Sequence, residues 1–159
     1  MDGPWRYTQP IPMTPYRLAE RFIGTKEVAG TAKSNPAVLA MLQLDAAWPK
    51  GDDVAWCSAF TNYIAWLLRL PRSKSLRARS WLGVGVPVQL EDAEVGFDVV
   101  ILQRGTGKQP GPEVLDAPGH VGFYAGVEGS KVMILGGNQG DSVSVSRYPK
   151  TQILGIRRL

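Results

Sequence analysis

The stretch Trp56-Cys57-Ser58-Ala59-Phe60 begins an apolar helix, predicted over residues 55–70, and contains the only cysteine of the chain. Asp52 and Asp53 come just before it, where acidic side chains suit the positive end of a helix dipole. The same dipole and the free amides of a first helical turn favour a thiolate over a thiol. A free cysteine is more often a small buried core residue. The stretch therefore leaves two roles open for Cys57, a core residue or a nucleophile.

Outside this helix, the first half of the chain predicts helices and the second half predicts strands. Thr14 and Asn35 each precede a proline, which is typical of a helix start. Apolar spacing then predicts helices over residues 15–24, 37–48 and 75–82. Alternating and β-branched segments predict strands at residues 99–102, 121–124, 132–135, 143–145 and 153–156. Helices followed by strands are typical of an α+β fold, so we expect N-terminal helices packed on one face of an antiparallel C-terminal β-sheet.

The length and charge of the chain limit its organisation and partners. A chain of 159 residues suits a single catalytic domain, residues 1–159, with an extended arm over residues 1–13 because prolines recur there. The net charge is +4, and the basic residues are dispersed apart from residues 69–79 and Arg157-Arg158, which disfavours a nucleic-acid partner. We find no basic-then-apolar leader and no apolar stretch near the ~20 residues that cross a bilayer. We therefore expect a monomer made in the cytoplasm, without membrane insertion, that needs another route to act elsewhere.

The only histidine, His120, stands at the start of a predicted strand. Asn138 follows the next predicted strand, and an antiparallel hairpin between the two can bring it beside His120. Asn138 could then accept the imidazole N–H and fix the tautomer. An asparagine among glycines is equally a turn residue with positive φ, and Gln139 takes the place of Asn138 if the turn points the other way.

The sequence offers few groups for a cofactor or a metal ion. One cysteine and one histidine cannot build a Cys/His zinc cluster. Neither a phosphate-binding loop nor an EF-hand loop is present. We therefore expect no cofactor and no metal.

Four motifs, taken in chain order, resemble papain-like amidases of the CHAP and NlpC type. They are Trp56-Cys57-Ser58-Ala59-Phe60, Ser80-Trp81-Leu82, Gly119-His120-Val121-Gly122-Phe123-Tyr124 and Leu135-Gly136-Gly137-Asn138-Gln139. The likeness spans roughly residues 24–158. It implies the papain-like form of the α+β fold and a cysteine amidase or peptidase whose partner is bacterial peptidoglycan. Such an enzyme is either an endopeptidase of the wall peptide or an N-acetylmuramoyl-L-alanine amidase.

The resemblance also implies roles for individual residues. Cys57 corresponds to the nucleophile, His120 to the general base and then acid, and Asn138 to the residue that orients the imidazole. Trp56 precedes the cysteine, as on the CHAP side of the family.

Four residues are candidates for binding the substrate. Trp56 and Trp81 could line a cleft for sugar or peptide, with core packing as the alternative. Asp53 could contact a substrate amine, with helix capping as the alternative. Gln139 lies in the same turn as Asn138.

The absence of a recognisable leader and wall-binding module resembles compact phage endolysins, which act in the periplasm and cell wall after release. Two alternatives stay open. One is an amidase effector toxin delivered between bacteria. The other is a non-catalytic wall-binding or tail structural module with the same fold.

Overall fold

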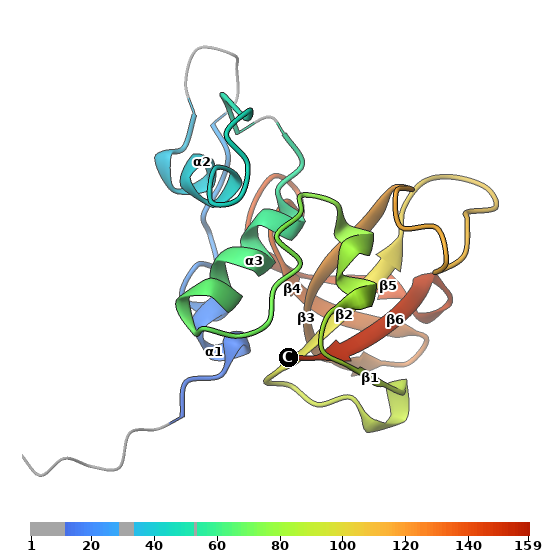
Figure 1. The fold of residues 1–159 in the computed structure, drawn as a ribbon. Helices are drawn as coiled ribbons and strands as arrows, with labels where there is room; N and C mark the ends of the chain where they lie inside the picture. Colours follow the sequence, from blue (N-terminus) through green and yellow to red (C-terminus); the bar gives the residue numbers. More distant parts are fainter. Residues whose placement is uncertain (1–11, 29–33, 53) are drawn as a thin grey trace, which may run out of the picture.

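The computed structural model of the protein describes residues 12–28, 34–52 and 54–159, so the predicted N-terminal arm lies almost wholly outside it. Within these residues, the three α-helices come first and all the strands follow them, as Figure 1 shows. The helices are α1 (Pro15–Glu20), α2 (Pro36–Leu42) and α3 (Cys57–Leu67). The strands are β1 (Val86–Val88), β2 (Asp98–Gln103), β3 (Gly119–Glu128), β4 (Lys131–Gly136), β5 (Ser144–Pro149) and β6 (Ile153–Arg158). Three short 3₁₀ segments are η1 (Ala78–Gly83), η2 (Leu90–Asp92) and η3 (Lys150–Gln152).

Helices α1 and α2 begin as the sequence predicts. The side chains of Thr14 and Asn35 each accept a backbone N–H of the first turn, and a proline occupies the first helical position. Both helices end earlier than predicted. At the end of α2, the Gln43 side chain donates to the carbonyl of Pro49 at 2.7 Å, so the chain folds back there instead of continuing to Trp48. No helix in the described ranges is long and apolar enough to cross a membrane.

Helix α3 begins at Cys57 with no side-chain cap. The carboxylate of Asp52, which the sequence places at the start of this helix, is buried elsewhere. Its Oδ2 accepts the backbone N–H groups of Val28 and Asn35 at 2.8 and 2.7 Å. The Asp52 side chain therefore does not cap α3 and instead joins the segment before α2 to the segment before α3.

The six strands of the described chain form one antiparallel sheet in the order β1-β6-β2-β3-β4-β5. Five of them were predicted, whereas β1 was not, because it is only three residues long and has a proline at its centre. The register pairs Leu102 of β2 with His120 of β3, and Phe123 of β3 with Leu135 of β4. The turn after β4 is thereby brought to the start of β3, where His120 lies.

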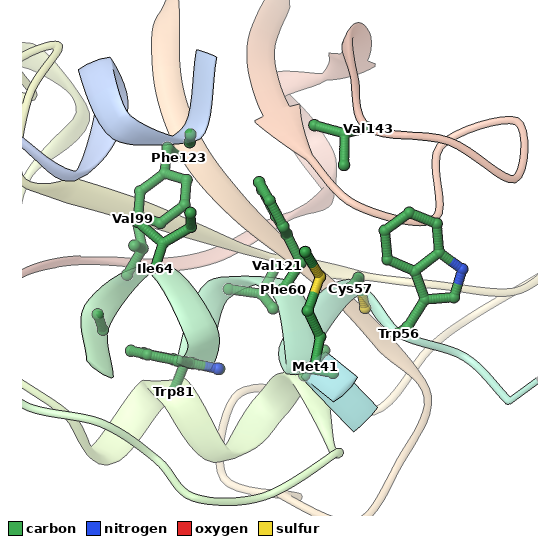
Figure 2. Packing of buried hydrophobic residues seen from close by; sticks show 14 of the residues in the cluster. Met41, Trp56, Cys57, Phe60, Ile64, Trp81, Val99, Val121, Phe123 and Val143 are labelled. Atoms are coloured by element: carbon green, nitrogen blue, oxygen red, sulfur yellow. The ribbon is translucent and has the colours of Figure 1, made fainter. Parts of the chain in front are cut away.

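The helices pack on one face of the sheet through a single apolar cluster. Trp56, Phe60 and Trp81 are fully buried in it, and Figure 2 shows Cys57 beside Trp56 and Phe60. Gly137 permits this close packing, because a Cβ added there would stand 2.8 Å from Phe60 Cβ. A second apolar cluster is separate from the first and consists of Val100, Leu102, Tyr124, Val132, Ile134 and Ile156.

A long loop, residues 104–118, connects β2 to β3 and is held by a buried arginine of η1. Arg79 is fully buried, and its Nε donates to the carbonyl of Pro118 at 2.9 Å. Its Nη1 donates to the carbonyls of Pro110, Gly111 and Val114 at 2.7 to 3.1 Å. One side chain therefore fixes the loop that leads directly to His120.

Candidate active site

The cysteine lies at the first residue of α3 and is 3% exposed. Its sulfur lies beside the His120 side chain and the backbone N–H groups of Val121 and Ser58, all of which stabilise a negative charge on it. Burial by itself raises the pKa of Cys57, but the hydrogen bond and charge of His120, aided by these amides, outweigh burial and lower it. The thiolate form of Cys57 is therefore favoured.

The histidine is the second residue of β3 and is 6% exposed. Burial lowers the pKa of His120, but the hydrogen bond and negative charge of Cys57, with a further hydrogen bond from Gln139, raise it overall. The charge of Arg104 acts in the opposite direction. The shifts of the two residues agree, because both favour transfer of the thiol proton to the imidazole.

Gln139 fixes the tautomer of this histidine. Its Oε1 lies 2.9 Å from His120 Nε2, and its Nε2 donates to the carbonyls of Ile134 and Ser144 at 3.2 and 2.6 Å. A carbonyl oxygen only accepts, so the nitrogen of the Gln139 amide must face the two carbonyls. The oxygen of the same amide must then face the imidazole. An amide oxygen only accepts, so Nε2 of His120 carries the proton and Nδ1 is left for the thiol.

Tyr148 of β5 contacts both Gln139 and His120. Its hydroxyl donates to Gln139 Oε1 at 3.0 Å, and its ring lies 5.3 Å from the His120 ring at an interplanar angle of 35°. Burial first, and then the negative charge of Cys57, raise the pKa of Tyr148 to about 12. The hydroxyl therefore stays protonated and remains a donor to Gln139.

The amide that reaches His120 belongs to Gln139 and not to Asn138, so the predicted contact of Asn138 is wrong. Asn138 adopts φ 57°, the left-handed conformation that a turn residue supplies. Gly136 makes room for the observed contact, because a Cβ there would stand 3.1 Å from Gln139 Oε1. The sequence identified the turn but could not decide which of two adjacent amides points inward.

The structure does not place the predicted substrate-binding residues together in a cleft. Trp56 and Trp81 are fully buried, and their indole N–H groups donate to Glu27 Oε2 and Ser58 Oγ, both at 2.9 Å. Both tryptophans are core residues, so their predicted place in a cleft is wrong. Gln139 is 6% exposed and is engaged with His120. Asp53 lies outside the described residues.

Two depressions flank the Cys57–His120 pair. The first, here called the Cys57 depression, has a volume of about 310 Å³ and is lined by Cys57, Ala78 and residues 116–119 among others. The second, the His120 depression, has about 360 Å³ and is lined by His120, Asn138 and Tyr148 among others. Arg104 lines both. Cys57 and His120 therefore each line a depression, which a cysteine sealed in the core would not do.

The site holds one nucleophile, one base and one orienting amide. The sulfur is activated by an imidazole whose tautomer is fixed, which is the arrangement used for nucleophilic attack on a carbonyl. Across residues 12–28, 34–52 and 54–159, no group of three or more His, Cys, Asp or Glu side chains is placed to hold a metal ion.

Comparisons with known proteins bear on the fold. No protein-family model matches the chain, and no curated protein matches it in sequence. The solved structure of NlpC1 from Trichomonas vaginalis is similar to 98% of this chain, with a TM-score of 0.56 and 15% sequence identity. The aligned part is 48% of that protein, so the chain spans about half of its length. The predicted papain-like α+β fold, with N-terminal helices on an antiparallel sheet, is confirmed.

Proposed function

We propose that the protein is a cysteine amidase that cleaves an amide bond in the peptide of bacterial peptidoglycan. One observation carries the proposal: the Cys57 sulfur lies beside the His120 imidazole, with Gln139 bonded to the far nitrogen of the ring. An NlpC-like fold and the CHAP-like and NlpC-like motifs of the sequence support peptidoglycan as the substrate class. The activity is that of an endopeptidase or an N-acetylmuramoyl-L-alanine amidase.

The mechanism begins with proton transfer from Cys57 to Nδ1 of His120. The thiolate forms a C–S bond with the scissile carbonyl carbon, and backbone amides at the start of α3 hold the oxyanion. His120 then returns the proton to the leaving amine as the C–N bond breaks. Water, deprotonated by His120, hydrolyses the thioester to a carboxylate and frees the thiol. Gln139 keeps the proton on Nε2 throughout.

The biological setting that we propose is that of a phage endolysin acting as a monomer in the periplasm and cell wall after release. Expression in the bacterial cytoplasm should then be tolerated, whereas export of the same protein to the periplasm should lyse the cells. Lysis from the cytoplasm alone would contradict this setting. A neighbouring immunity gene would favour an effector toxin, and a neighbouring holin gene the endolysin.

Digestion of purified peptidoglycan tests the activity and names the bond. The wild-type protein should release fragments whose new L-Ala, D-Glu or diaminopimelate termini are identified by mass spectrometry. Cys57→Ala should lower the release by roughly a thousandfold or more, because the nucleophile is lost. Intact muropeptides after long incubation, with the wild type and Cys57→Ala binding the wall equally, would overturn the proposal in favour of a binding module.

A further inference from the structure

Arg104 is the one residue that lines both depressions beside the reacting pair. It follows β2 directly, its side chain is exposed, and it forms no hydrogen bond or ion pair with any other residue that the structure describes. Of the described lysines and arginines, it alone lines the His120 depression. A free guanidinium therefore stands where a bound substrate has to pass.

The other charged groups of the two depressions do not neutralise it. Arg77 and Asp116 line the Cys57 depression, and Arg77 Nη1 donates to the backbone carbonyl of Asp116 at 2.9 Å. The two arginines and one aspartate that line the depressions have a net charge of +1, and a protonated His120 adds a further positive charge. The charge of Arg104 also reaches the site, because it lowers the pKa of both His120 and Tyr148.

We propose that Arg104 binds a carboxylate of the substrate next to the scissile amide, and so makes the site selective for an acidic peptide over its carboxamide counterpart. A guanidinium presents a planar fork of donors that matches a carboxylate with two parallel hydrogen bonds. The inference rests on the proposed function, in which the substrate is a stem peptide. A glutamate joined through its side chain leaves its α-carboxylate free beside that amide.

A pair of alkylating reagents tests the charge of the site without a substrate. Iodoacetate and iodoacetamide attack the same thiolate but differ by one negative charge. The rate constant of iodoacetate at Cys57 divided by that of iodoacetamide should fall about two- to fivefold in Arg104→Gln, the range for an exposed charge pair. The His120 imidazolium also attracts the anionic reagent, so the test depends on the change in the ratio between the wild type and Arg104→Gln, and not on the wild-type ratio itself. Added salt should reduce this change, because it screens the charge of Arg104.

Three control variants separate the site from the net charge of the protein. Arg104→Lys should keep most of the wild-type ratio, and Asp116→Asn should raise it. Lys108→Gln removes one positive charge from the same loop, but Lys108 lines neither depression, so the ratio should not change. An unchanged ratio in Arg104→Gln, or an equal fall in Lys108→Gln, would overturn the role of Arg104.

Two peptides that differ only in a carboxylate or a carboxamide beside the scissile bond test the selectivity itself. The wild type should have the higher kcat/KM for the carboxylate, and Arg104→Gln should reduce that preference by about two- to fivefold. Equal kcat/KM for both peptides would overturn the inference while leaving the amidase intact. Cleavage of neither peptide, with no alkylation of Cys57, would reject the proposed function and the inference together.

Discussion

At the scale of single residues, the site depends on how Gln139 is held. The carbonyls of Ile134 and Ser144 take its amide N–H groups, and the Tyr148 hydroxyl donates to its oxygen. These contacts leave the amide one orientation, and through it they select the His120 tautomer whose Nδ1 can accept the thiol proton.

Replacement of Gln139 tests this positioning role. Gln139→Ala should lower kcat roughly 10- to 100-fold, the range seen when a partner that orients a reactive side chain is lost. The alkylation rate of Cys57 near pH 6 should fall as well, since a wrongly oriented imidazole no longer stabilises the thiolate. Steady-state kinetics and iodoacetamide labelling measure the two effects.

Asn138→Gly is the matched control for this substitution. Glycine tolerates the positive φ of this turn position, so the variant should keep kcat within about twofold of the wild type. A large loss in Asn138→Gly together with a small one in Gln139→Ala would restore Asn138 as the orienting residue and reject the assignment of Gln139.

At the scale of elements, the loop before β3 is the part that the sequence predicted least. The predicted strands at residues 99–102 and 121–124 leave a long connection between them. The anchor of this loop was not predicted, because Arg79 lies in the basic segment around η1, where an arginine is ordinarily a solvated surface residue. Only the fold reveals that this side chain is buried against four carbonyls of the loop.

Arg79→Met should remove these bonds while filling a similar volume. The carbonyls of Pro110, Gly111, Val114 and Pro118 would lose their donor, so the free energy of unfolding should fall by roughly 2–4 kcal/mol. Denaturant unfolding measures the change, and Arg77→Met, in which an exposed arginine loses a single loop bond, is the comparison. Equal stability of Arg79→Met and the wild type would show that the loop is held by other contacts.

The helix starts show which local features the sequence does determine. A capping side chain followed by proline placed α1 and α2 correctly, because both signals act within one turn. The end of α2 depends on a contact with Pro49 beyond the helix, and the contacts of Asp52 depend on residues 17 and 24 positions away; there the predictions were wrong. The two tryptophans at positions 56 and 81 were misplaced for the same reason, since an indole suits a cleft as well as a core.

At the scale of the whole molecule, the order of helices and strands was enough to predict the fold. It predicted an antiparallel sheet with helices on one face, and the similarity to NlpC1 agrees with it. The meeting of Cys57 and His120 needs this complete arrangement, because α3 must pack on β3 to bring the sulfur to the imidazole (Figure 1). The reactivity of the thiol therefore reports on the fold and the site at once.

The pH dependence of that reactivity has a definite sign. The pKa of Cys57 is lowered and that of His120 is raised, and both shifts favour the thiolate–imidazolium pair over the neutral pair. The ion pair is lost on the acid side when the thiolate takes up a proton, and on the alkaline side when the imidazolium loses one. In His120→Ala, the thiol should titrate at a higher pKa, because burial then acts without the opposing partner.

The rate of Cys57 alkylation by iodoacetamide at pH 6, well below the ordinary thiol pKa of about 8.5, is the most direct test of the active-site pair. The wild-type protein should react faster than free cysteine, and His120→Ala should not. A wild-type rate no higher than that of free cysteine would contradict the thiolate–imidazolium pair and the amidase mechanism built on it.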